Sequence, residues 1–183
     1  MILHLVDDEK IINRTIKDFE NALPGQNVFL CFYQQKRTET FTAKYITPSN
    51  LVIFYSSNDK LDIEITSITK VIVHCLTLPK LYFIQKYIPM NIPIYWFVWG
   101  YDLYGLYLSK LGYNTYPFNN PVISKKRWIF NRVKLLFRYQ SVESYTFSQF
   151  VKRRINFVAC PDGDYLLLKK YIKGFSAQRV QYF

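Results

Sequence analysis

The chain has 183 residues, enough for one sizeable hydrophobic core. Half of the residues are hydrophobic and 19% are aromatic, which excludes an intrinsically disordered chain. Lys and Arg number 24 against 13 Asp and Glu, and the resulting net charge of +11 favours an anionic partner. Nucleic acid, acidic lipid headgroups and a phosphorylated substrate all meet that description.

The compartment is indicated by the cysteines and by the amino terminus. Cys31, Cys75 and Cys160 lie far apart, within or at the end of apolar runs, so we expect buried, reduced thiols in a cytosolic protein. The amino terminus lacks a basic lead and meets acidic residues after a short apolar run, unlike a signal peptide. The apolar tract from Ile92 to Leu108 contains Asp102 and is shorter than the roughly 20 residues that span a bilayer, so we expect no transmembrane helix.

Strand and helix patterns alternate along the first half of the chain. Apolar runs at Ile2 to Val6 and Asn27 to Tyr33 predict buried strands, and the apolar stripe of Lys10 to Leu23 predicts a helix between them. This crossover predicts a parallel pair with a right-handed connection. Further strands are predicted at Leu51 to Tyr55 and Lys70 to Cys75, and further helices at Asp59 to Thr66 and Leu78 to Ile88.

The alternation continues in the second half. Strands are predicted at Ile94 to Trp99 and Ile155 to Cys160, the start of another at Val180 to Phe183, a loop at Tyr113 to Val122, and helices at Leu103 to Leu111, over much of Ser124 to Arg154, and at Asp162 to Lys173. The pattern predicts an α/β protein with a Rossmann-like, doubly wound, mostly parallel sheet and helices on both faces. We expect residues 1–183 to form a single domain.

The segment from Ser124 to Arg154 is strongly basic. At 100° per residue, Arg127, Lys134 and Arg138 share one narrow helix face, and apolar residues fill most of the rest. One interpretation is a solvated face over a core contact. The other is a contact with an anionic membrane surface or with a pyrophosphate group.

Several signatures of known chemistry are missing. The glycines form neither G-x-G-x-x-G nor a Walker phosphate loop. There is no H-E-x-x-H, no cysteine cluster with zinc spacing and no G-x-S-x-G elbow, which disfavours metalloproteases, zinc fingers and α/β-hydrolases. We therefore expect neither a metal nor a cofactor.

Polar residues follow three of the predicted strands. Asp7, Asp8 and Glu9 come after the first strand. His74 ends the Lys70 strand, and Asp102 follows the Ile94 strand. If these strand ends converge, a carboxylate or imidazole there could act as a general base toward an attacking hydroxyl. The alternatives are structural: Asp8 and Asp102 as helix caps, and His74 as a hydrogen-bonded core histidine.

Asp102 has aromatic neighbours in the sequence. Trp99 and Tyr104 flank Asp102, a combination suited to stacking on a sugar or a base, and Gly100 permits a turn that larger residues would resist. We therefore predict that Trp99, Gly100 and Tyr104 shape a binding site.

Four segments carry a family resemblance. D-E-K-I-I-N-R-T-I-K-D-F-E, P-G-Q-N-V-F, V-H-C-L and W-F-V-W-G-Y-D-L-Y, in that order, are similar to the amino-terminal half of bacterial TDP-N-acetylfucosamine:lipid II N-acetylfucosaminyltransferases. These enzymes are also called 4-acetamido-4,6-dideoxygalactose transferases. The family's usual W-G-G-D corresponds to Trp99 to Asp102, where one glycine is replaced by Tyr101.

The resemblance implies a GT-B glycosyltransferase with two Rossmann-like domains. Such an enzyme transfers a deoxyamino sugar from a dTDP-sugar to an undecaprenyl-pyrophosphate-linked acceptor during surface polysaccharide synthesis. The resemblance then assigns this chain to the acceptor-side half, inactive alone, with the donor held by a carboxyl-terminal domain. Its implied location is cytoplasmic, peripheral to the inner face of the bacterial inner membrane.

Two other classes of function compete with this one. A flavodoxin-like nucleotide-binding or regulatory module would bind a mononucleotide or flavin without catalysis. A nucleic-acid-binding domain would use the aromatic residues for stacking, but no recognised motif is present and the aromatics lie mainly in apolar runs, so we do not expect a nucleic-acid partner.

Overall fold

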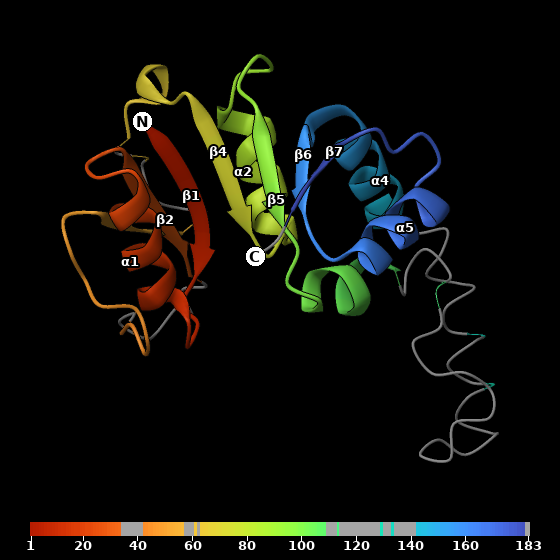
Figure 1. The fold of residues 1–183 in the computed structure, drawn as a ribbon, viewed down its shortest axis with the longest axis horizontal. Coiled ribbons are helices and arrows are strands. Elements are labelled where there is room, and N and C mark those ends of the chain that lie inside the picture. The colour runs from red at the N-terminus through yellow and green to blue at the C-terminus, as the bar shows by residue number, and fades with distance from the viewer. Residues whose placement is uncertain are drawn as a thin grey trace. The chain divides into compact units, whose positions relative to one another are not determined.

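The computed structural model describes residues 1–33, 42–56, 61, 63–108, 113, 129, 133 and 142–181. The chain is divided into two compact units, Met1–Phe97 and Val98–Phe183 (Figure 1). That residues 1–183 form one domain stays a prediction.

The first unit contains a parallel sheet. Its strands are β1 (Ile2–Asp7), β2 (Asn27–Phe32), β3 (Val52–Tyr55), β4 (Lys70–His74) and β5 (Ile94–Phe97), in the spatial order β3-β2-β1-β4-β5. Every pairing among them is parallel. The order reverses direction between β1 and β4, as in Rossmann-like folds, so the predicted fold class is confirmed.

Helices cover both faces of this sheet. The helix α1 (Ile12–Ala22) packs its apolar stripe, including Ile16 and Phe19, against a core that contains Val6 and Phe29. The helix α2 (Leu78–Tyr87) packs Phe83 against Phe32, which faces the other side of the sheet. Side chains alternate along a strand, so His4 and Val6 of β1 face α1, whereas Asp7 faces α2.

The second unit repeats the strand–helix–strand arrangement on a smaller scale. The strands β6 (Phe157–Ala159) and β7 (Gln178–Val180) pair in parallel. The helix α5 (Asp162–Tyr171) connects them. The helix α4 (Val142–Arg154) precedes β6. Near the start of the unit lies η2 (Tyr101–Leu108), which has the wide turns of a π-helix.

Two boundaries differ from the sequence prediction for physical reasons. The helix predicted from Leu103 begins at Tyr101, because Gly100 has a φ of 70° and turns the chain before that point. The final strand begins at Gln178, earlier than the apolar pattern suggested. The Gln178 N–H donates to Asn156 O at 2.9 Å, so pairing with β6 overrides the polar sequence.

Some predicted elements lie wholly or partly outside the described residues. The helix predicted at Asp59 to Thr66 is described at residues 61 and 63–66, where the short 3₁₀ helix η1 (Ile65–Ser67) begins. Arg127, Lys134 and Arg138 also lie outside them, as does most of the Tyr113 to Val122 loop. Of the helices in the described ranges, none has both the length and the apolar character needed to cross a bilayer.

Two glycines of the second unit provide a matched test of backbone conformation. Gly100 has a positive φ, whereas Gly163 lies within α5, and a Cβ at either position would meet no atom within 4 Å. We expect Gly100→Ala to destabilise the protein by about 1–2 kcal/mol, because L-residues resist the left-handed conformation. Gly163→Ala should stabilise it by about 0.5–1 kcal/mol through helix propensity. Urea unfolding of both variants measures the difference, and equal shifts would contradict the assigned turn.

Candidate functional site

A buried ammonium group joins the carboxyl ends of β1 and β4. Lys80 of α2 is fully buried, and its Nζ lies 2.5 Å from Asp7 Oδ2, 2.5 Å from His74 O and 3.0 Å from Cys75 O. A lysine ammonium has three N–H donors, and these three acceptors use all of them. The buried charge is therefore both paired and fully hydrogen-bonded, as a buried cation requires.

The same contacts hold an unusual turn after β4. Cys75 has a φ of 58°, a left-handed conformation that costs a non-glycine residue about 1–2 kcal/mol. Lys80 binds the carbonyl oxygens of both His74 and Cys75, and the Cys75 N–H donates to Phe97 O at 3.2 Å. The strained turn is thus fixed from both sides, a feature that often accompanies functional sites.

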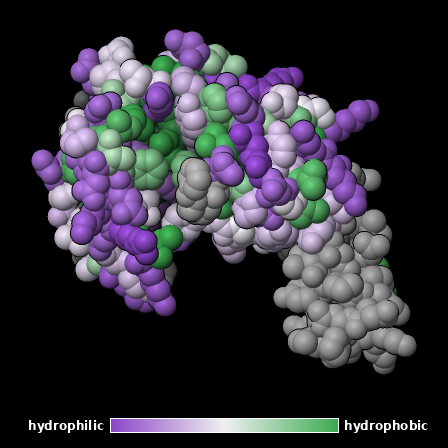
Figure 2. Space-filling view, viewed as in Figure 1, coloured by the Kyte–Doolittle hydropathy of each residue, from purple (hydrophilic) through white to green (hydrophobic). Residues whose placement is uncertain are grey.

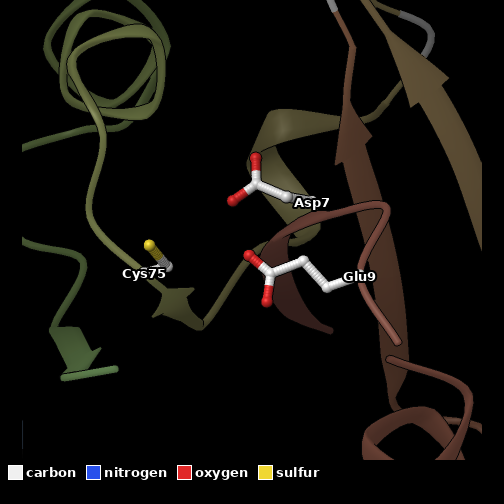
Figure 3. A group of neighbouring side chains, drawn as sticks. All are labelled: Asp7, Glu9 and Cys75. Carbon is white, nitrogen blue, oxygen red and sulfur yellow. The ribbon is translucent and has the colours of Figure 1, made fainter. Parts of the chain in front are cut away.

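Carboxylates gather beside this turn, at the point where the strand order reverses. Ligand atoms of Asp7, Glu9 and Cys75 lie within 4.8 Å of one another. Figure 3 shows the Asp7 and Glu9 carboxylates directed into the same space beside Cys75. The three side chains have the donor types of a metal site, but the Lys80 ammonium already lies against Asp7 and supplies the neutralising charge. The arrangement suits acceptance of hydrogen bonds from hydroxyl groups.

Asp8 binds the backbone of a loop. Its carboxylate accepts the backbone N–H groups of Lys44, Tyr45 and Ile46, at 2.5, 2.9 and 2.7 Å. Desolvation raises the pKa of Asp8, but these N–H donors and the nearby Lys44 charge outweigh it, and the pKa is lowered overall. The helix α1 has no side-chain cap, so the interpretation of Asp8 as a helix cap is wrong.

His74 belongs to a buried hydrogen-bond chain on the α1 face of the sheet. Its Nε2 lies 3.1 Å from His4 Nδ1, and His4 Nε2 lies 3.0 Å from Asn27 Oδ1. The Asn27 amide nitrogen donates to Phe19 O, Glu20 Oε1 and Leu23 O, so its oxygen must be the acceptor. His4 Nε2–H therefore donates to Asn27, and His74 Nε2–H donates to His4 Nδ1.

Both imidazoles of this hydrogen-bonded group are neutral. Burial lowers the pKa of His4 to about 4, although Asn27 and Glu20 act in the opposite direction. The pKa of His74 is well below its usual value because of burial, with further lowering by His4 and Lys80. The arrangement is that of a hydrogen-bonded core histidine, the structural alternative considered above. A catalytic role for His74 stays a prediction.

The turn in the second unit has its own carboxylate. Asp102 is fully buried, and its Oδ1 accepts the backbone N–H groups of Trp99 and Leu103, both at 2.9 Å. Because η2 already begins at Tyr101, Asp102 lies inside the helix and stabilises the tight turn at Gly100. Trp99 and Gly100 are partly exposed beside it.

Tyr104 links this turn to α5. Its hydroxyl donates to Asp164 Oδ1, and burial together with that carboxylate raises the pKa of the Tyr104 phenol. Its ring lies 5.8 Å from that of Tyr113, which in turn lies 5.6 Å from that of Tyr171. The structure therefore places Tyr104 in a partly exposed aromatic group with a carboxylate at the carboxyl end of β6.

The predicted site residues thus fall into several environments. Glu9 joins Asp7 and Cys75, Asp8 binds a loop, and the His74 imidazole lies on the α1 face, opposite to Asp7 and Lys80. Asp102, Trp99, Gly100 and Tyr104 belong to the second unit. The sequence prediction missed Lys80 and Asp164. Lys80 precedes Phe83, Ile84 and Tyr87 at helical spacings of three, four and seven, and a lysine at such a position can indicate a buried charge.

The cysteines are buried and free, as predicted. Burial raises the pKa of Cys31 to about 12 and that of Cys160 to about 11. Both thiols are therefore protonated near neutral pH and are poor nucleophiles.

Removal of the Lys80 ammonium tests its structural role. We expect Lys80→Met to lower the free energy of unfolding by about 3–5 kcal/mol, because Asp7 and two carbonyl groups lose their partner. Lys86→Met on the exposed part of the same helix is the control and should change stability by no more than about 0.5 kcal/mol. Urea unfolding measures both, and similar values would show that the buried ion pair contributes little.

The imidazole pair predicts acid sensitivity. The pKa of His4 is about 4 in the folded protein and about 6.5 in the unfolded chain, so folding favours the neutral imidazole. Its contribution to the free energy of unfolding is therefore complete above pH 6.5 and is lost as the pH falls toward 4. The loss from His4 alone is on the order of 3 kcal/mol. Unfolding free energies across this pH interval measure it. His4→Gln should flatten the dependence, and an unchanged slope would refute the assignment.

Comparison with known protein families, with curated proteins and with solved structures finds no match to this chain. Function is therefore inferred from the side chains at the ends of the strands and from the sequence resemblance described above.

Proposed function

We propose that this protein is the acceptor-binding part of a glycosyltransferase that acts on a lipid-linked saccharide. The observation that carries the proposal is the pair of partly exposed carboxylates, Asp7 and Glu9, beside the strained turn at Cys75. They lie where ligands bind in open parallel sheets, outside the carboxyl ends of the strands at the reversal of strand order.

The chemistry at this point favours a hydroxyl-rich ligand over a phosphate. Phosphate sites at the first strand of such folds use glycines and the amino end of a helix. Here, the segment between β1 and α1 contains Asp8 and Glu9 and no glycine. Carboxylates repel phosphate and accept hydrogen bonds from sugar hydroxyls. This argues against the flavodoxin-like alternative, and it fits a transferase whose dTDP-sugar donor is bound by another domain.

The proposed reaction assigns a role to a carboxylate at the carboxyl end of β1. The acceptor hydroxyl oxygen attacks the anomeric carbon of the donor, the bond from that carbon to the dTDP oxygen breaks, and the hydroxyl proton passes to a carboxylate. Glu9 is our candidate for that base, because its carboxylate is partly exposed and is directed into the space beside Cys75 (Figure 3). Asp7 forms an ion pair with Lys80, and Asp8 accepts three backbone N–H groups.

The second unit, taken by itself, has aromatic residues of the kind that stack on sugar rings. Trp99 and Tyr104 are partly exposed, and Asp102 fixes the turn that carries them. We propose that Trp99 and Tyr104 stack on a sugar ring. The excess positive charge of the chain supports work at an anionic membrane surface, where such acceptors lie.

A binding measurement tests the acceptor proposal without requiring turnover. The probe is an N-acetylhexosamine disaccharide linked through pyrophosphate to a short, water-soluble prenyl chain, titrated into the protein by calorimetry. We expect the wild type to bind and Glu9→Gln to bind about tenfold more weakly, because a hydrogen bond to a charged acceptor is worth roughly 1.5–3 kcal/mol.

The control places the same substitution at the other end of the sheet. Glu64 is exposed and precedes β4, so Glu64→Gln should bind like the wild type. Equal affinities for Glu9→Gln and Glu64→Gln would exclude Glu9 from the site. Tight binding of flavin mononucleotide, with none of the saccharide, would favour the non-catalytic module instead.

A further inference from the structure

A cluster of cations lies at the carboxyl-terminal ends of α4 and α5. The last turn of α4 contributes Lys152 and Arg153, and the end of α5 and the turn after it contribute Lys169, Lys170 and Lys173. All except Lys152 are exposed. We call these five residues the basic helix-end surface.

The two helix ends are adjacent. A Cβ placed on Gly174, in the turn after α5, would lie 3.5 Å from Lys152 Cε and 3.8 Å from its Nζ. The α4 and α5 cations therefore belong to one surface of the second unit. Figure 2 shows hydrophilic side chains in purple with a smaller hydrophobic group in green over these helices.

Two cations of this surface lie over aromatic rings, Lys169 over Tyr165 and Lys170 over Tyr171. Within the described ranges, no carboxylate forms an ion pair with any of its five cations. The acidic residues of α5, Asp162 and Asp164, lie in its first turn, where they bind Arg179 and Tyr104. Lysines at a helix end complement the helix dipole, but that does not account for the apolar residues beside them.

Two large apolar side chains accompany the cations. Leu166 precedes Lys169 and Lys170 by three and four residues, so it shares their face of α5, and it is 65% exposed. Tyr145 precedes Lys152 by seven residues on the same face of α4, and it is 68% exposed. Leucine and tyrosine between lysines are typical of surfaces that lie in the headgroup region of a bilayer.

We propose that the basic helix-end surface binds the anionic face of a lipid bilayer, with Leu166 and Tyr145 entering the headgroup region. Cations attract acidic headgroups, and the apolar side chains favour a membrane over a nucleic acid, which offers phosphate without an apolar layer. The inference goes beyond the proposed function and does not depend on it, because a saccharide need not be present.

Sedimentation with lipid vesicles tests the proposal. The probes are vesicles of phosphatidylcholine with and without phosphatidylglycerol, and the protein should sediment only with the anionic ones. The combined variant Lys169→Glu, Lys170→Glu and Lys173→Glu should reduce the partition coefficient at least about tenfold. The matched control, Lys10→Glu, Lys17→Glu and Lys86→Glu, has the same net charge but changes exposed residues of the first unit, and it should retain most of the binding.

A second variant separates membrane insertion from simple charge attraction. Leu166→Gln leaves the charge unchanged and should weaken vesicle binding several-fold. Equal loss in both triple variants, or no effect of Leu166→Gln, would overturn the proposal. So would salt-sensitive binding to single-stranded DNA without binding to anionic vesicles. Failure of vesicle binding with intact saccharide binding would reject this surface alone, and the reverse result would reject only the proposed function.

Discussion

The buried ammonium of Lys80 is the interaction on which the first unit depends. It connects the end of β1, the end of β4 and the start of α2 through one charge with three acceptors. Taking a charge out of water is costly, and it is tolerated when every donor finds a partner in fixed geometry. The same bonds impose the left-handed turn at Cys75. The geometry at the reversal of strand order is therefore set by the interior of the protein.

The two faces of the sheet divide the polar residues between them. On the α1 face, the imidazoles of His4 and His74 are buried and neutral, and their hydrogen bonds run inward to Asn27. Asp7, the last residue of β1, and Glu9, just after it, are partly exposed. A polar residue next to a strand end can thus serve the core or the surface, and the direction of its side chain decides which.

The sequence predicted the fold well because its signals were local and consistent. Apolar runs marked the strands of the first unit, and the stripe of Ile12, Ile16 and Phe19 marked α1. The site was harder to predict, since its partners are distant in sequence: Asp7 and Lys80 are 73 residues apart. Periodicity reports which residues share a face, but it does not report which strands become neighbours. Asp8 shows the same limit, because its three N–H donors lie 36 to 38 residues away.

The hydrogen bonds from Lys44, Tyr45 and Ile46 to Asp8 bear on the pairing of strands between molecules. These residues lead toward β3, which pairs with β2 and lies at the end of the order of described strands. A strand at the end of a sheet can recruit another chain. Because one carboxylate at the end of β1 anchors the incoming segment, β3 arrives in a fixed alignment on β2. Asp8 thereby favours the pairing of β3 with its own sheet over its release to another chain.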